Sequence, residues 1–182
     1  MIKIFIFLII TSLSFTQNNQ FNQTIFVNGK ARKATFKVSR SSESFFNREN
    51  FFIKKGKIIE IISPDTFLIQ NSSRLEEIKL IGLLDISTLQ QKNLSKSIKN
   101  KITRKYLNNK VTIYKPKNYK DKGLDFNHAY LIKKDIIINL DILKQGLGII
   151  HDGQEIFKPL KQIFVQSMEQ AEKKKRGLWG KL

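Results

Sequence analysis

Three short apolar runs, separated by turn residues, dominate the chain between residues 57 and 85. The runs are residues 57–62, 67–70 and 78–85. Ser63-Pro64-Asp65-Thr66 fills the first gap, and runs of this length bounded by such residues predict an antiparallel β-meander. Gly82, inside the third run, predicts a bulge or the kind of bend that a small barrel needs.

Further along, the apolar spacing changes to that of a helix. Residues 89–107 carry an apolar residue every four positions, with basic residues on the other faces, which predicts an amphipathic helix. The predicted stripe is Leu94, Ile98, Ile102 and Tyr106. Residues 110–114 and 129–132 are rich in β-branched residues and tyrosine and predict a fourth and a fifth strand.

The C-terminal third predicts two more helices. Asn139 is expected to cap a short helix that ends at Gly146, with glycine in the C′ position. The last helix is expected to begin near Pro159 and to end at Gly177. Its expected buried stripe is Leu160, Ile163, Phe164, Met168 and Ala171. Leu178-Trp179 are expected to anchor the chain end to the core.

The N-terminal part has a different character. Residues 1–16, with Lys3 before an apolar run and small residues after it, predict a secretory signal too short to span a bilayer as a helix. A buried first strand is the alternative. Residues 17–54 predict an extension with a possible hairpin around Asn28-Gly29. Residues 55–182 then form the main domain, and the protein is expected to be exported to the periplasm, the cell surface or the medium.

The charge balance points to anionic partners. Against 33 Lys and Arg stand 15 Asp and Glu, for a net charge of +18. This excess predicts attraction to nucleic acid, DNA or RNA, and secondly to anionic membrane surfaces. A bias toward Lys, Ile and Asn without any nucleic-acid role is the alternative. The absence of cysteine excludes disulfides, thiolate zinc sites, thiol nucleophiles and a lipid anchor on an N-terminal cysteine.

Four short motifs combine turn or glycine positions with apolar residues in a fixed order. They are Ser63-Pro64-Asp65-Thr66, Lys79-Leu80-Ile81-Gly82-Leu83, Leu143-Lys144-Gln145-Gly146-Leu147 and Ala171-Glu172-Lys173-Lys174-Lys175-Arg176-Gly177-Leu178-Trp179. In this order and spacing they resemble the staphylococcal-nuclease-like (thermonuclease) domain. The resemblance implies an α+β fold, mainly β, with a five-stranded Greek-key OB-fold barrel and about three helices. That fold usually binds oligonucleotides on strands two and three and the adjoining loops.

The resemblance also implies a chemistry, Ca²⁺-dependent phosphodiester hydrolysis with two metal-bound carboxylates, a glutamate and two arginines. Asp65 matches the principal metal ligand, and Asp85 supplies a second carboxylate if one residue is inserted. Lys79 takes the place of the phosphate-gripping arginine, which keeps the charge but loses the bidentate fork. Lys79 and Asp85 are therefore the candidate catalytic residues, and Asp65 and Asp85 the candidate metal ligands.

Other positions depart from the family pattern. Ser63 replaces a companion aspartate, the glutamate position reads Ser87 or Thr88, and the second arginine falls on Phe126. The neighbouring lysines are candidate phosphate ligands: Lys115, Lys117, Lys120 and Lys122. His128 could replace a lost acid or base, or could be a rim histidine bonded to the backbone.

Two main hypotheses follow from these departures. In the first, an exported basic protein binds nucleic acid, or another polyanion, with hydrolysis reduced or lost. In the second, a rearranged site with Asp65, Asp85 and Lys79 remains an active Ca²⁺-dependent endonuclease. A third hypothesis is a surface adaptor whose extension recruits a protein partner. Asp65 also has a purely local explanation, because Ser-Pro-Asp-Thr is favourable β-turn chemistry by itself.

Overall fold

The computed structural model describes residues 20–27, 30–37, 45–72, 74–86 and 92–180, and the chain divides into two compact units, Met1–Arg40 and Ser41–Leu182. In the first unit, β1 (Gln20–Val27) pairs antiparallel with β2 (Lys30–Lys37). These two strands fall in the region where the sequence predicts a hairpin. Its Asn28-Gly29 turn and the predicted signal sequence lie outside the described residues.

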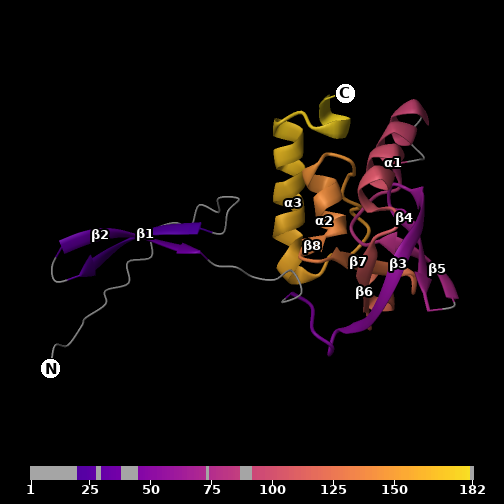
Figure 1. The fold of residues 1–182 in the computed structure, drawn as a ribbon, viewed down its shortest axis with the longest axis horizontal. Coiled ribbons are helices and arrows are strands. Elements are labelled where there is room, and N and C mark those ends of the chain that lie inside the picture. Colours follow the sequence, from indigo (N-terminus) through magenta and orange to yellow (C-terminus); the bar gives the residue numbers. More distant parts are fainter. Residues whose placement is uncertain (1–19, 28–29, 38–44, 73, 87–91, 181–182) are drawn as a thin grey trace. The chain divides into compact units, whose positions relative to one another are not determined.

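Six strands form the sheet of the second unit (Figure 1). They are β3 (Phe51–Ser63), β4 (Thr66–Asn71), β5 (Arg74–Leu80), β6 (Lys110–Pro116), β7 (His128–Lys133) and β8 (Ile136–Ile137). Their order is β5-β4-β3-β6-β7-β8, and all these neighbours are antiparallel. In addition β5 runs parallel to β7, with Lys79 paired to His128 and Leu80 to Ala129. This extra pairing closes five of the strands into a ring.

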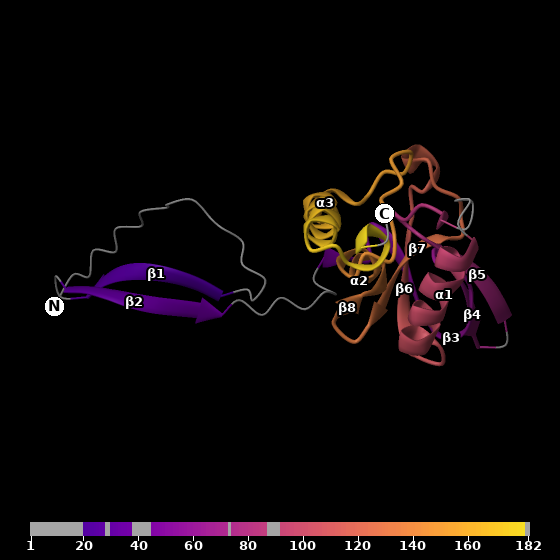
Figure 2. The ribbon, with the colours of Figure 1, turned by 90° about the horizontal axis from the view of Figure 1, so that it is seen from above.

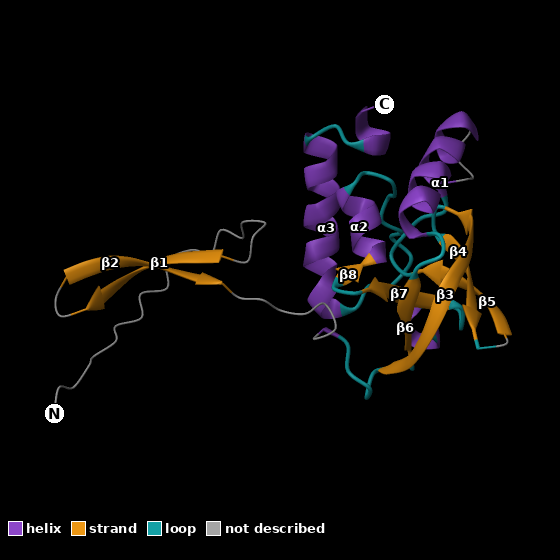
Figure 3. Cartoon of the chain, viewed as in Figure 1, coloured by secondary structure: helices purple, strands orange, loops and turns teal. Residues whose placement is uncertain are grey.

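Three α-helices accompany the ring (Figure 3), which confirms the predicted α+β class. They are α1 (Lys92–Tyr106), α2 (Ile138–Lys144) and α3 (Lys158–Lys173). Figures 1 and 2, two views at 90° to each other, both show α2 between α3 and the strands. None of the helices in the described ranges is long and apolar enough to cross a membrane.

The helical stripes follow the predicted periodicity. In α1, Ile98, Ile102 and Tyr106 are buried, and Leu94 packs against the core. In α3 the buried positions are Leu160, Phe164, Ser167 and Ala171. Ser167 replaces the predicted Met168 in this stripe, because the steps of four, three and four residues keep one face toward the core. The Ser167 hydroxyl is satisfied within the helix, donating to the carbonyl of Ile163 at 2.7 Å.

The second unit includes residues that were predicted to belong to the extension. Phe46 and Phe51 are buried in the core, although the domain was expected to begin at residue 55. Phe46 stacks on Tyr114 of β6, with ring centroids 4.6 Å apart. The aromatic side chains just before and at the start of β3 therefore cover one end of the sheet.

Two local predictions were wrong. The third run does not continue as a strand to Asp85: β5 begins at Arg74 and ends at Leu80, and Gly82 lies in the following bend at φ 79°. Asn139 does not cap α2, because the N-cap is Ile137.

Asn139 instead joins the strands near the point where the ring closes. Its side-chain amide donates to the carbonyls of Ile81 and Ala129 at 3.0 and 3.1 Å, and its oxygen accepts the N–H of Leu131 at 3.0 Å. Asn139 is fully buried. Buried backbone N–H and C=O groups need hydrogen-bond partners, and the side chain of Asn139 supplies them for Ile81, Ala129 and Leu131.

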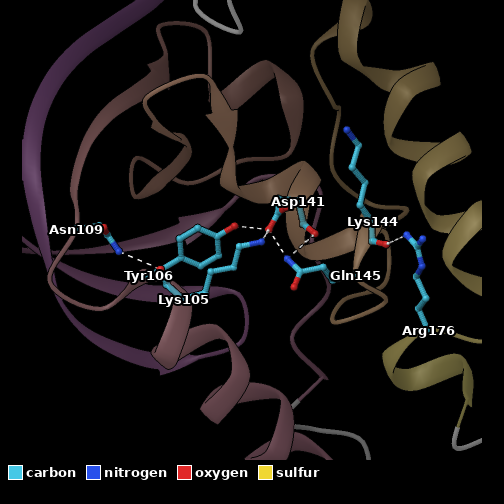
Figure 4. A network of polar contacts seen from close by, with 7 residues as sticks. All are labelled: Lys105, Tyr106, Asn109, Asp141, Lys144, Gln145 and Arg176. Atoms are coloured by element: carbon cyan, nitrogen blue, oxygen red, sulfur yellow. Dashed lines mark hydrogen bonds and ion pairs between the residues drawn. The ribbon is translucent and has the colours of Figure 1, made fainter. Parts of the chain in front are cut away.

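A carboxylate at the surface ties α1 to α2 (Figure 4). Asp141 accepts hydrogen bonds from the Tyr106 hydroxyl and the Gln145 amide, and forms an ion pair with Lys105 at 2.7 Å. Burial, and then the bond to this carboxylate, raise the pKa of Tyr106 far above its usual value. Tyr106 therefore stays protonated and acts as a permanent donor to Asp141.

Candidate functional site

The tight turn between β3 and β4 places Asp65 at the edge of the ring. Its side chain is only 6% exposed, and its carboxylate accepts hydrogen bonds from the Ser63 hydroxyl and from Thr66 Oγ1 at 3.2 Å. Its main-chain carbonyl accepts the N–H of Leu80, the last residue of β5, at 2.7 Å. Asp65 is thus held by its own turn and by the strand that carries Lys79. Ser63, at the position where the resemblance implies a companion aspartate, bonds Asp65 directly.

The charge of Asp85, one of the two predicted metal ligands, acts on Asp65, the other. Burial raises the pKa of Asp65, the hydrogen bond from Ser63 opposes that rise, and the negative charge of Asp85 adds to it. Asp85 is half-buried and follows the bend at Gly82. A cation between the two side chains would offset the effect of the Asp85 charge on Asp65.

The donor set fits Ca²⁺ only in part. Ca²⁺ takes about six to eight oxygen ligands, and Asp65 and Asp85 provide two carboxylates. Within the described part of the chain, no group of three or more His, Cys, Asp or Glu side chains is placed to hold a metal ion. Water or the phosphate oxygens of a substrate would have to supply the remaining ligands.

His128, the first residue of β7, has a protein contact at each ring nitrogen. Nδ1 accepts the N–H of Asp125 at 2.9 Å, and Nε2 lies 3.0 Å from Nε2 of Gln154. The Gln154 oxygen accepts the N–H of Gly82 at 2.8 Å, which fixes the orientation of this amide. Burial lowers the pKa of His128, so the imidazole is neutral at pH 7. These contacts favour the structural alternative for His128 over a role in acid–base catalysis.

The candidate lysines fall into two groups. Lys115 lies in β6 and not in the loop, is 3% exposed, and forms an ion pair with Glu76. Lys122 forms an ion pair with Glu155 at 2.8 Å. Lys117 and Lys120 are exposed, as is Lys79 beside His128. Lys117, Lys120 and Lys79 are therefore the candidates best placed to meet a phosphate.

Exposed aromatic rings adjoin these lysines. Phe52 in β3 is 48% exposed and Phe126 is 52% exposed. The ammonium of Lys117 lies 5.6 Å from the ring centre of Phe52, and that of Lys115 lies 4.2 Å from the ring centre of Phe126. Tyr119 meets Phe126 edge to face, with centroids 5.8 Å apart. We call Phe52, Lys117, Tyr119 and Phe126 the aromatic surface.

One feature of the sequence could have predicted this surface. Phe51 and Phe52 are neighbours in a strand, so their side chains point to opposite faces. Phe51 is buried, and Phe52 must then point away from the core that Phe51 enters. Phe126 had been noted only as the position of a missing arginine.

No family model matches this chain, and no curated protein does. The resemblance to the thermonuclease-like domain rests on its four motifs. Ser87 and Thr88, the glutamate positions of that resemblance, lie outside the described residues. Among the residues that are described, no arginine contributes to the pKa of Asp65 or His128, whereas the charge of Lys79 lowers that of His128. The site thus offers two carboxylates and one lysine, without a forked cation.

Replacing Asp65 with asparagine should stabilise the protein at pH 7 in a buffer that contains a chelator. The folded-state pKa of Asp65 is raised, so its favourable contribution is complete below the unfolded value of 3.8 and is lost as pH rises through the folded value. At pH 7 the ionised carboxylate therefore costs stability, which Asp65→Asn removes. Urea unfolding between pH 4 and pH 7 measures the difference, which should shrink as pH falls.

The control for this substitution is Asp121→Asn, a change of the same chemistry at an exposed position. It should leave the free energy of unfolding within about 0.5 kcal/mol of the wild type. A variant Asp65→Asn that is less stable than the wild type at pH 7 would contradict the expectation.

Proposed function

We propose that this protein is an exported, thermonuclease-like nucleic-acid-binding protein in which phosphodiester hydrolysis is reduced or lost. Residues 1–16 would act as the export signal. The strand order, with a parallel contact between the third and fifth ring strands, supports the finer assignment to a five-stranded Greek-key OB barrel. The loop between the fourth and fifth strands of that fold, which here carries Lys117, Tyr119 and Phe126, is one of its usual binding loops.

The observation that carries the binding proposal is the aromatic surface. Proteins commonly bind single-stranded nucleic acid through exposed aromatic rings beside lysines. The bases stack on the rings, and the ammonium groups neutralise the phosphates. Phe52 and Phe126 are about half exposed, and the ammonium of the exposed Lys117 lies 5.6 Å from the ring centre of Phe52. The net charge of +18 favours the same class of ligand.

The geometry around Asp65 supports weakened hydrolysis. Hydrolysis of a phosphodiester needs charge donors that are fixed around the developing negative charge, and losing one typically costs ~10²–10³-fold in rate. Lys79 offers a point charge where a fork would grip two oxygens. Nδ1 of His128 accepts the N–H of Asp125, so the neutral ring carries its proton on Nε2, which faces the Gln154 amide. A substitute acid or base therefore has to come from elsewhere.

Binding is tested by fluorescence anisotropy with labelled single-stranded DNA and RNA at several salt concentrations. The double variant Phe52→Ala/Phe126→Ala should weaken binding at least about 30-fold, since stacking contributes about 1–3 kcal/mol per base. Its control, Ile136→Ala/Val165→Ala, removes two exposed apolar side chains elsewhere and should bind like the wild type. No binding at low salt, or equal losses in both variants, would overturn the proposal.

A second candidate function is an active Ca²⁺-dependent endonuclease, which the effect of the Asp85 charge on the buried Asp65 favours. Bound Ca²⁺ would neutralise the scissile phosphate, with Asp65 and Asp85 holding it and Lys79 contacting the phosphate. Incubation of the same strands with Ca²⁺ or with chelator separates the two functions. Metal-dependent cleavage that Asp65→Ala abolishes establishes the enzyme, and binding with intact strands under every metal excludes it.

A further inference from the structure

A hollow of about 510 Å³ lies where the outer faces of β3, β6 and β7 adjoin the end of β4. Four lysines line it: Lys55, Lys57, Lys110 and Lys134. No acidic side chain is among the lining residues, and we call the site the lysine hollow. The polar side chains of Gln70 and Thr112 also border it, and Ile132 contributes apolar surface.

Regular sheet geometry places three of these lysines together. Lys57 pairs with Lys110 across β3 and β6, and Lys55 pairs with Thr112 two residue pairs further on. Residues two apart in a strand share a face, so Lys55, Lys57 and Lys110 point to the same side. Ile58 and Val111, which follow Lys57 and Lys110, are buried on the opposite side.

The fourth lysine comes from a turn. Thr112 pairs with Ile132 of β7, and Lys134 stands two residues later at φ 54°. Lys134 thereby approaches the same hollow from the end of β7.

The lysine hollow holds unbalanced positive charge. The ion pairs formed by lysines of the described part of the chain take up Lys105, Lys115 and Lys122, and none of the four hollow lysines. Like charges placed directly opposite each other across a sheet, as Lys57 and Lys110 are, destabilise the pairing. An anion in the hollow would convert this repulsion into attraction.

The ligand chemistry follows from the number and type of these groups. Four ammonium groups around one hollow exceed what a single carboxylate can neutralise, whereas linked phosphates carry several charges and many acceptor oxygens. Each lysine supplies three donors on a flexible stem, which suits phosphate oxygens in varied positions. The hollow is also large enough for more than one phosphate group.

The lysine hollow is separate from the aromatic surface. Phe52 and Lys55 are three residues apart in an unbroken stretch of β3, so their side chains leave opposite faces of the strand. A ligand in the hollow therefore does not depend on stacking against Phe52 or Phe126.

We propose that the lysine hollow is a second anion-binding site, which takes linked phosphate groups. These phosphates come either from a free phosphate chain or from the backbone of a nucleic-acid strand. The site needs no base, so it stands whether or not the aromatic surface binds nucleic acid.

Isothermal titration of the full chain with inorganic tripolyphosphate tests the proposal. The wild type should bind saturably, with about one ligand per chain. The variant Lys55→Gln/Lys57→Gln/Lys110→Gln/Lys134→Gln should bind at least about tenfold more weakly, and Lys110→Gln alone should show a smaller loss in the same direction. The control is Lys96→Gln/Lys101→Gln/Lys161→Gln/Lys174→Gln, which removes the same charge from exposed positions on and just beyond helices, outside the hollow.

The outcomes are distinct. A control variant whose affinity for tripolyphosphate stays within about twofold of the wild type supports the lysine hollow as the binding site. A higher melting temperature of the hollow variant without ligand also supports it, because the repulsion between the lysines is removed. Equal losses in the two four-lysine variants, or no saturable binding by the wild type, would overturn it. Neither of these results bears on stacking, which Phe52→Ala/Phe126→Ala measures independently.

A competition experiment identifies the source of the phosphates. In the Phe52→Ala/Phe126→Ala variant, a single-stranded oligonucleotide that displaces tripolyphosphate assigns the hollow to a strand backbone. Retained tripolyphosphate binding without displacement assigns it to free phosphate chains.

Discussion

Replacing Glu76 with alanine is expected to lower the free energy of unfolding by about 3–5 kcal/mol, because it leaves a buried charge without its partner. Lys115 is 3% exposed and its ammonium pairs with Glu76 across the ring. The remaining neighbour of that ammonium, the ring of Phe126 at 4.2 Å, offers much less compensation than a carboxylate. Urea unfolding followed by circular dichroism measures the loss.

A matched ion pair provides the control for Glu76. Glu155→Ala removes the partner of Lys122, but Glu155 is 57% exposed and water can replace it. The expected loss is about 0–1 kcal/mol. The double variant Glu76→Leu/Lys115→Met should be far less destabilised than Glu76→Ala, since an apolar pair needs no charge partner. Similar small losses for Glu76→Ala and Glu155→Ala would show that Lys115 reaches solvent after all.

Replacing Gly146 with alanine is expected to cost about 3 kcal/mol of stability. Gly146 ends α2 at φ 67°, a left-handed conformation that costs an ordinary residue about 1–2 kcal/mol. A Cβ there would also collide with the carbonyl of Arg176 and meet the Trp179 ring at 3.1 Å, and such overpacking costs about 1–3 kcal/mol. Thermal and urea unfolding of Gly146→Ala measure the combined loss of stability from backbone strain and overpacking.

The contact around Gly146 joins two of the four motifs. The N–H of Leu178 donates to the carbonyl of Gly146 at 2.8 Å, and Leu178 is buried, which confirms it as an anchor of the chain end. Gly177 faces the same contact from the other side, at φ 54°. These glycines therefore permit a close backbone approach between α2 and the chain end, and their motifs describe the fold rather than the chemistry.

Gly153→Ala is the control for Gly146. Gly153 is exposed, and a Cβ there would meet only the His151 side chain, which can move aside. Gly153→Ala is expected to change the free energy of unfolding by no more than about 0.5 kcal/mol. If Gly146→Ala is no more damaging than Gly153→Ala, the close approach is not required for folding.

The sequence could predict only those features of the candidate site that depend on residues adjacent in the chain. Asp65 was expected in a turn and lies in one, held by Ser63 and Thr66, because these residues are adjacent in the chain. Lys115 was expected to face a ligand and instead pairs with Glu76, 39 positions away. His128 meets Gln154, and the lysine hollow combines residues from four strands and two turns; in both cases the partners are distant in sequence.

The sequence by itself determined the approximate positions of most strands and helices of the second unit, since apolar periods of two and of about four residues require only local geometry. It also determined the positive charge and the absence of thiol chemistry. The tertiary structure alone decided that β5 meets β7, that Asn139 joins them, and that Phe52 and Phe126 both remain exposed beside lysines. The physical reason is that strand register and side-chain contacts between distant segments depend on how all the apolar faces pack together, which no single stretch of the chain specifies.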